Sequence, residues 1–316
     1  MLGEYNFVLE HTSRQAVIGL KLNNICSDLH LEAWAGTSWR RTEVWKSLIV
    51  PSAPYLALVG DISVPGSFTN RDAAGPENFA EFLRWLSQRF VRVFVVLGNH
   101  EFFTLSKRYD GEPGTTVNSI VEQVNDLCQS LPGVELLHRR SVVIEDDIRV
   151  IGATLWSDID LKRDSLVSLV ENSISDYHRI MVDCRSSGSQ RLLTVQDTVE
   201  WHHLDRAFIK EEIRQAQILG QRCLILTHHS PAVSETCKPE YSDSVLNCAF
   251  ATDLVDDLLR MRSVHTWVYG HTHWNARLRV RDTNLVSNQL GYKKENSMFD
   301  CESCGIPYDP EFTVYI

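Results

Sequence analysis

Five short groups of aspartate, asparagine and histidine residues are the part of this sequence that could carry out chemistry. They read Asp28-Leu29-His30, Gly60-Asp61-Ile62, Gly98-Asn99-His100-Glu101, His228-His229 and Gly270-His271-Thr272-His273. Their side chains offer carboxylate, amide and imidazole groups, which are donors for ions such as Mn, Fe, Zn or Co. An aspartate and a histidine two positions apart, as in the first group, can both turn inward and share one ion.

Each group directly follows an apolar run that is typical of a buried strand. The runs are Leu20–Cys26, Tyr55–Val59, Val91–Leu97, Cys223–Thr227 and Val264–Tyr269. Ligands of open α/β sheets bind at the edge where the carboxyl ends of the strands lie. We therefore expect the five groups to meet at one such edge; the alternative is five unrelated turns.

Taken in order, DLH, GDI, GNHE, HH and GHTH resemble the motifs of the calcineurin-like metallophosphoesterase superfamily, and they span positions 28 to 273. This resemblance implies an α/β fold, a four-layer αββα sandwich with two mixed β-sheets. Four further segments resemble a bacterial-type branch of the superfamily whose substrate is unassigned. These segments are Gly152–Asp158, Asp176–Ile180, Asn288–Tyr292 and Glu295-Asn296.

The resemblance also implies a dinuclear metal centre. The positions that match the family's ligands are Asp28, His30, Asp61 and His273 for the first ion, and Asp61, Asn99, His228 and His271 for the second. Asp61 would bridge, because a carboxylate can give one oxygen to each of two ions about 3.5 to 4 Å apart. We expect Mn, with Fe, Zn or Co as alternatives, because the donor set contains no thiolate. His229 is the alternative to His228, which follows its strand directly.

The mechanism that the resemblance implies is hydrolysis of a phosphate ester. A water held between the ions has its pKa lowered toward neutrality and attacks phosphorus in line, and the ions stabilise charge on the phosphoryl oxygens. His100 is not a ligand in the family pattern, and it is expected to protonate the leaving oxygen as a general acid. The alternative is a histidine that only orients Asn99.

Differences between this sequence and two known subclasses of the superfamily argue against assigning it to either. Protein Ser/Thr phosphatases carry a carboxylate and an arginine soon after their GD motif, and the carboxylate that orients their catalytic histidine has no counterpart at Val64. Lipid-A pathway hydrolases have arginine where His100 stands. A nucleotide phosphodiesterase or nuclease is the alternative enzyme. A non-catalytic scaffold is the alternative from another class, but scaffolds usually lack ligands or the histidine, and this sequence keeps them all.

Bulk properties favour a small substrate. The net charge of −10 disfavours the basic surface that nucleic-acid binders carry. We see no run of the roughly 18 to 20 apolar residues that a membrane span needs, and no signal peptide. The 8 cysteines are expected to be reduced thiols in the cytosol. A small phosphorylated partner is therefore predicted, without a nucleic-acid surface or a membrane, and the oligomeric state stays open.

We expect a single domain over residues 20–316 after an N-terminal extension at residues 1–19. The helices are predicted over Ser38–Ile49, Glu77–Phe90, Val117–Leu131, Leu161–Ser173, Val195–Leu219 and Ala251–Met261. Further strands are predicted within Val134–Leu155 and over Arg277–Val280 and Asn284–Ser287.

Three smaller features lie outside the main motifs. His202 and His203 are predicted to face solvent, because other residues form the apolar stripe of their helix. Cys301 and Cys304 form a lone CxxC pair, whereas a structural zinc needs four ligands. Tyr177, with the loop around Asp176, and Asn288–Tyr292 are expected to shape the substrate pocket, with a purely structural corner as the alternative.

Overall fold

The computed structural model describes residues 21–34, 41–64, 78–103, 115–184, 189–292 and 305–316. The predicted extension at residues 1–19 lies outside the described residues. So do Cys301, Cys304, Glu295-Asn296 and the first residues of the helix predicted from Ser38.

Two β-sheets form the centre of the molecule. The first has the strand order β13-β1-β2-β3-β4, in which β1 to β4 are parallel and β13 is antiparallel. Its strands are β1 (Lys21–Cys26), β2 (Tyr55–Val59), β3 (Arg92–Val96), β4 (Val134–Leu136) and β13 (Thr313–Tyr315).

The second sheet has the order β11-β12-β10-β9-β6-β5, with β5 and β11 antiparallel at its two edges. Its strands are β5 (Arg140–Ile144), β6 (Ile148–Ala153), β9 (Arg222–Thr227), β10 (Val264–Tyr269), β11 (Arg277–Val280) and β12 (Thr283–Ser287). Both sheets are mixed, as predicted.

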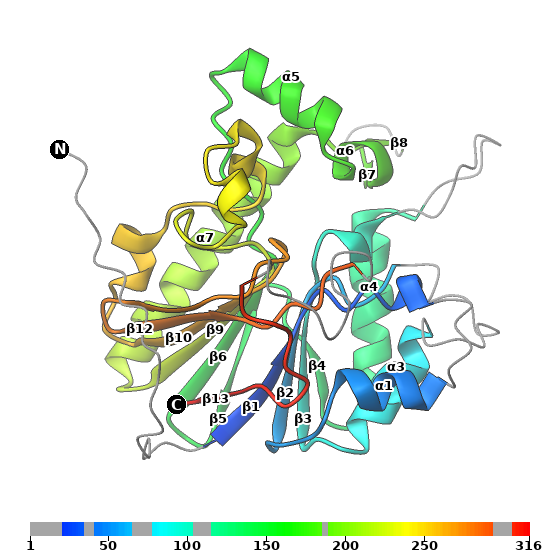
Figure 1. Ribbon diagram of the computed structural model, residues 1–316, viewed down its shortest axis with the longest axis vertical. Coiled ribbons are helices and arrows are strands. Elements are labelled where there is room, and N and C mark those ends of the chain that lie inside the picture. The colour runs from blue at the N-terminus through cyan, green and yellow to red at the C-terminus, as the bar shows by residue number, and fades with distance from the viewer. Residues whose placement is uncertain (1–20, 35–40, 65–77, 104–114, 185–188, 293–304) are drawn as a thin grey trace.

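Helices cover the outer faces of the two sheets and complete four layers (Figure 1). The helices α1 (Arg41–Leu48), α3 (Phe79–Ser87) and α4 (Val117–Gln129) lie beside the first sheet, and α7 (Val195–Ile218) lies beside the second. The expected αββα sandwich is therefore confirmed. No helix among the described residues has both the length and the apolar character that crossing a membrane requires.

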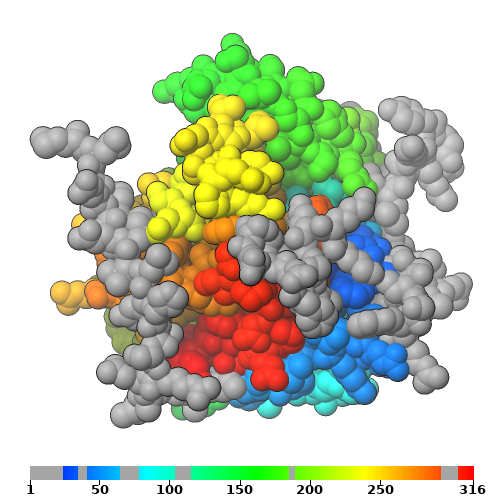
Figure 2. All heavy atoms as spheres, viewed as in Figure 1, coloured from blue at the N-terminus to red at the C-terminus, as the bar shows by residue number. Residues whose placement is uncertain are grey.

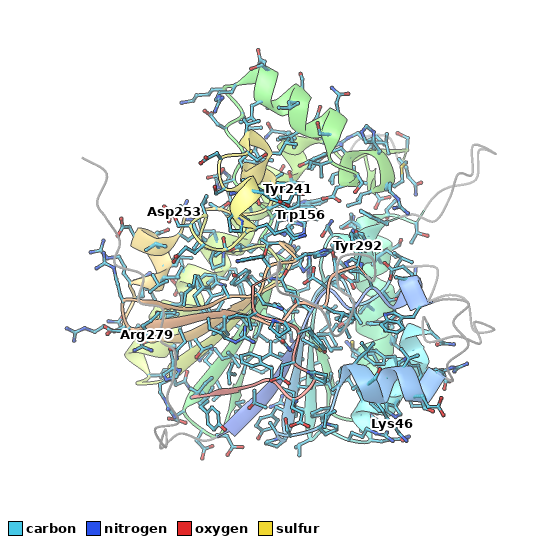
Figure 3. All side chains as sticks on the ribbon, in the orientation of Figure 1. Lys46, Trp156, Tyr241, Asp253, Arg279 and Tyr292 are labelled. Atoms are coloured by element: carbon cyan, nitrogen blue, oxygen red, sulfur yellow. The ribbon has the colours of Figure 1, made fainter. Side chains whose placement is uncertain are left out.

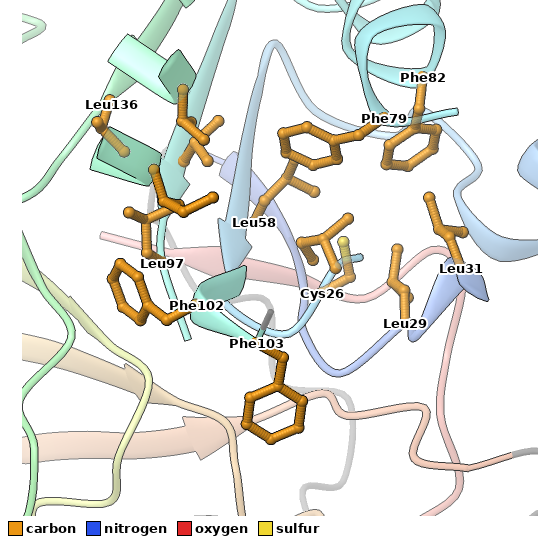
Figure 4. Packing of buried hydrophobic residues seen from close by; sticks show 14 of the residues in the cluster. Cys26, Leu29, Leu31, Leu58, Phe79, Phe82, Leu97, Phe102, Phe103 and Leu136 are labelled. Atoms are coloured by element: carbon orange, nitrogen blue, oxygen red, sulfur yellow. The ribbon is translucent and has the colours of Figure 1, made fainter. Parts of the chain in front are cut away.

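Three apolar clusters fill the spaces between the layers. In the first, Phe79 and Phe82 of α3 lie near Leu58 of β2 and Cys26 of β1 (Figure 4). The second joins α7 to the outer face of the second sheet. The third lies between the sheets and includes residues of both. Because β2 is buried along its whole length, its sequence is a continuous apolar run rather than an alternating one.

The strand register places the motif loops of each sheet side by side at the carboxyl ends of the strands. Val59, the last residue of β2, pairs with Val96 at the end of β3. The GDI and GNHE groups therefore leave the sheet side by side. In the second sheet, Val268 near the end of β10 pairs with Leu226 of β9, so that the HH and GHTH groups also emerge together.

Two segments that are far apart in the sequence lie above these strand ends (Figures 1 and 2). The first contains α5 (Asp164–Ser173) and α6 (Asp176–Arg179) and is followed by the small hairpin of β7 (Met181–Asp183) and β8 (Gln190–Leu192). The second contains the short helices η3 (Pro239–Tyr241) and η4 (Val245–Ala249). We call residues 164–179 and 237–250 the cap.

Two local predictions were wrong. The helix expected over Ala251–Met261 is only the π-helical turn η5 (Val255–Leu259), because the amides of Thr252 and Leu254 donate to the carbonyls of Ser230 and Pro231. His202 is fully buried, with its Nδ1 against the carbonyl of Trp156, instead of facing solvent. His203 is 55% exposed, as predicted.

Gly60 and Gly98 allow the GDI and GNHE loops to approach each other closely. Gly60 has a φ of +83°, and a Cβ there would collide with the ring of His228. A Cβ at Gly98 would collide with the side chain and the amide of Asp61. Both glycines are therefore required by the position of the predicted ligands.

We expect Gly98→Ala to lower the free energy of unfolding by about 1–3 kcal/mol through overpacking. It should also weaken metal binding, because Asp61 must move. Gly220→Ala is the control for added bulk, because nothing lies within 4 Å of a Cβ at this position. Unlike Gly98, Gly220 has a positive φ, of +67°. The control should lose about 1–2 kcal/mol from its left-handed backbone alone. Metal titration and thermal unfolding of both variants test this, and unchanged metal affinity in Gly98→Ala would contradict it.

Candidate metal centre

All seven predicted ligands lie together at the carboxyl ends of the strands. His273 Nε2 is 3.4 Å from Asp28 Oδ1 and 3.2 Å from His30 Nε2. His228 Nε2 is 3.3 Å from Asp61 Oδ1. Donor atoms thus form one cluster of Asp28, His30 and His273 and another of Asp61, His228 and His271. Each cluster contains three of the four ligands predicted for one ion.

Asp61 lies between the two clusters. Its Oδ1 faces His228, whereas its Oδ2 is 4.0 Å from His30 Nε2. The two oxygens of one carboxylate therefore point toward different clusters, which is the arrangement that a bridging ligand needs.

The backbone is unusual at five of the predicted ligands. Their φ angles are 53° at Asp28, 44° at His30, 52° at Asp61, 70° at His271 and 49° at His273. Residues other than glycine rarely adopt positive φ, although aspartate and histidine tolerate it better than most. Such angles cost of order 1–3 kcal/mol each and gather at functional sites. The ligand loops therefore adopt unfavourable backbone conformations in order to bring their side chains together.

The charge of the centre fits divalent cations. Asp28 is completely buried and Asp61 is 1% exposed, yet within the described part of the chain neither forms an ion pair with lysine or arginine. Burial disfavours the Asp61 carboxylate, but the imidazoles of His228 and His100 outweigh burial and hold the pKa of Asp61 well below its usual range. Buried carboxylates without a cation are costly. The nitrogen and oxygen donors around them are those that Mn, Fe, Zn and Co accept.

The pKa of His228 reflects the same negative potential of the buried carboxylates. Burial alone would disfavour a charged ring at His228, but Asp61 raises the pKa of His228 to about 10. By contrast, burial and neighbouring imidazoles hold the pKa of His271 well below its usual range.

The geometry favours His228 over His229 as the ligand. Val59 O lies 3.0 Å from His228 Nδ1, which orients Nε2 toward the cluster. His229 instead packs behind the centre, with its ring centroid 4.0 Å from that of His271 and 5.2 Å from that of Trp156.

Glu101 joins the two glycine loops, a role that the sequence analysis did not assign. Its buried carboxylate accepts hydrogen bonds from the amides of Asp61 at 2.9 Å, Ile62 at 2.6 Å and Gly98 at 2.7 Å. Burial and the nearby Asp61 carboxylate raise the pKa of Glu101 to about 7. Its position as the last residue of the GNHE motif is the feature of the sequence that could have indicated this role.

Asp176 fixes the orientation of Asn99. The amide Nδ2 of Asn99 donates to Asp176 Oδ1 at 2.8 Å, so Asn99 Oδ1 faces the centre, 3.0 Å from His228 Nε2. Burial raises the pKa of Asp176 to about 6. Tyr177, which was expected at the pocket, is instead buried in the first apolar cluster with its hydroxyl 3.2 Å from Thr198 Oγ1.

Glu32 contacts two histidines of the centre and was also missed. Its Oε1 is 3.1 Å from His30 Nδ1 and 3.8 Å from His100 Nδ1. Burial opposes ionisation, but these two imidazoles lower the pKa of Glu32 to about 2. A carboxylate beside His100 is therefore present, although it comes from the 3₁₀ helix η1 (Leu31–Trp34) and not from position 64.

His100 lies at the rim of the centre with its side chain 12% exposed. Its Nε2 is 3.9 Å from Asp61 Oδ2 and 3.1 Å from the hydroxyl of Tyr292. Burial disfavours the charged ring, but Asp61 and Glu32 outweigh burial and raise the pKa of His100. A protonated imidazole at this place can donate a proton.

The Asn288–Tyr292 segment combines support with access to the pocket. Gln289 Oε1 accepts from the amide of His273 at 2.7 Å, and Asn288 Nδ2 donates to Ile25 O at 2.7 Å. Tyr292 lines a cavity of about 490 Å³ that borders Asp61 and His100. In Figure 3 this tyrosine lies below the cap residue Tyr241.

The chain belongs to the calcineurin-like phosphoesterase family, whose sequence profile matches residues 24–275. It is 30% identical over 252 residues to an uncharacterized protein, L509, of Acanthamoeba polyphaga mimivirus, which covers 78% of this chain and 81% of that protein.

Solved structures of low identity share the fold. Phosphopantetheinyl hydrolase from Mycobacterium tuberculosis has a TM-score of 0.64 at 18% identity, covering 93% of this chain and 99% of that one. A dimetal phosphatase from Danio rerio has a TM-score of 0.50 at 12% identity, covering 87% of this chain and 88% of that one.

Removing Asp61 should have a larger effect on metal content than removing a ligand of one cluster. We expect Asp61→Ala to lose both ions and His30→Ala to weaken mainly one, because only Asp61 faces both clusters. Elemental analysis of the dialysed proteins measures this. His265→Ala, near the start of β10 and in none of the candidate ligand groups, should keep the wild-type content. Two tightly held ions in Asp61→Ala would rule out the bridging role.

Proposed function

We propose that this chain hydrolyses small phosphate esters with the help of two divalent ions, with His100 as the general acid. One observation carries the proposal. Six residues with nitrogen or oxygen donors meet around a buried aspartate whose two oxygens face separate clusters, and His100 stands beside them at the wall of a cavity.

The residues present would hold the first ion through Asp28, His30, Asp61 and His273, and the second through Asp61, Asn99, His228 and His271. When bound, two such ions supply Lewis-acid activation of water and stabilisation of charge on phosphoryl oxygens. Mn is our proposal for the metal, because the donors are nitrogen and oxygen without thiolate.

The chain's own residues orient the acid. Glu32 faces Nδ1 of His100, which leaves Nε2 directed toward the cavity. The hydroxyl of Tyr292, 3.1 Å from Nε2, marks a position from which an oxygen can approach this nitrogen. The leaving oxygen of a bound ester would take the proton there.

The alternatives have weaker support. A nuclease would need cations along a nucleic-acid backbone, whereas the described residues that line the cavity include one lysine and no arginine. A scaffold without catalysis would not need His100 beside a full ligand set.

A cytosolic location stays a prediction from cysteine usage; the six cysteines that the structure describes are free thiols.

A substrate panel with added Mn tests the function. It should contain phosphate monoesters, phosphodiesters and nucleic acids, assayed with the metal-loaded protein and after chelation. We expect metal-dependent release from small esters and little from nucleic acid. Preferred cleavage of nucleic acid would favour the nuclease alternative, and no turnover of any ester would favour the scaffold.

Replacing His100 should affect esters according to their leaving group. A general acid contributes about 10² to 10⁴ in rate, most of it where the leaving group is a poor one. We expect His100→Ala to slow alkyl ester hydrolysis by that factor and to spare much of the p-nitrophenyl phosphate activity, with both ions retained. Equal losses on the two substrates would assign His100 to binding or positioning, and loss of metal would assign it to orienting Asn99.

Replacing Glu32 should give a milder form of the same pattern. Glu32→Gln keeps the shape of the side chain but removes the charge that orients His100 through Nδ1. We expect kcat on alkyl esters to fall by about tenfold or more, with KM and p-nitrophenyl phosphate turnover less affected. In the double variant with His100→Ala, Glu32→Gln should cause little further loss. Fully additive effects would show that Glu32 acts independently of His100.

A further inference from the structure

The cavity beside the metal centre is larger than a phosphate group requires. Its volume is about 490 Å³, within the range of roughly 300–1,000 Å³ that is usual for small organic ligands. Its inner end is formed by predicted ligands, including Asp61 and His271. The rest of the space must therefore take the organic part of an ester.

The cap supplies an apolar wall to this space. Ile174 comes from its first segment, and Leu246 and Phe250 come from its second. The ring of Phe250 stacks on His271 with centroids 4.8 Å apart, so the apolar wall begins directly at a predicted ligand. An organic group that lies beside His271 would consequently contact the ring of Phe250.

A single lysine interrupts the apolar wall. Lys238 is half-buried, and among the residues that the structure describes it is the only lysine or arginine lining the cavity. It forms no ion pair with a described acidic side chain, whereas the cavity carboxylate Asp176 is already engaged by Asn99. Because Lys238 belongs to the cap and not to the motif loops, it is placed to meet the far end of a substrate.

We propose that the preferred substrate is a small phosphate ester whose organic group has an apolar body and a second anionic group. The apolar body would lie against Leu246 and Phe250, and the second anion would pair with Lys238. This inference rests on the proposed function, since it assumes that the phosphate is held at the metal centre.

The apolar body is tested with butyl, hexyl and octyl phosphate. Burial of one methylene is worth about 0.8 kcal/mol, so kcat/KM should rise roughly fourfold for each methylene that enters the cavity. Leu246→Ala should reduce this slope. Val245→Ala is the matched control. Val245 is next to Leu246 in the sequence, but its side chain is 49% exposed and does not line the cavity. A flat dependence on chain length in the wild type would overturn the apolar contact.

The second anion is tested with the same chains ending in a carboxylate. A hydrogen bond to a charged group contributes about 1.5–3 kcal/mol, so Lys238→Met should lower kcat/KM for the carboxylate esters about tenfold or more. It should change the plain alkyl esters less than twofold. Lys162→Met removes the same charge from an exposed position near the cap and should change neither set.

The outcomes separate this inference from the proposed function. Equal losses on both substrate sets in Lys238→Met would mean that Lys238 holds the transferred phosphate, and no loss would mean that it holds nothing; either result overturns the second anion. Metal-loaded wild type that hydrolyses p-nitrophenyl phosphate but fails these tests refutes the inference alone. Wild type that hydrolyses no ester refutes both.

Discussion

Two buried carboxylates without a lysine or arginine partner impose the constraint on which the described structure depends. Asp28 and Asp61 are held among imidazoles where water is excluded, and their mutual repulsion is opposed within the described chain only by histidines. Such an arrangement is unfavourable unless cations offset it. The two carboxylates are brought together by the positive φ angles of the ligand loops, by Gly60 and Gly98, and by the aligned strand ends.

Around these carboxylates, hydrogen bonds from other parts of the chain hold the donors in place. Glu101 ties the loops after β2 and β3 through their amides, Asp176 holds the Asn99 amide, and Gln289 holds the backbone of His273. Each is itself buried, so water does not compete for these contacts. Preorganisation of this kind keeps metal ligands oriented and raises affinity.

The inner part of this arrangement was predictable from the sequence, because parallel strands of one sheet bring their carboxyl ends to the same edge. Here two such edges, one from each sheet, meet at the centre. The sequence predicted the convergence of Asp28, Asp61 and the histidines without any knowledge of the cap. It singled out Asp176–Ile180 as a motif but could not show that Asp176 meets Asn99 across 77 positions, because the fold alone brings such distant residues together. Burial of His202 was missed since a histidine on the polar side of a helix stripe gives no sign of a carbonyl partner.

The order of the ligands along the chain has a consequence for synthesis. His273 follows 243 positions behind His30, and the edge strand β13 that pairs with β1 is formed by Thr313–Tyr315. Contacts of such long sequence separation form slowly. The complete set of predicted ligands therefore cannot assemble until the GHTH group has been synthesised, so that a centre with two ions forms only after that point. A chain truncated before the GHTH group would keep most of both sheets yet lack the complete site.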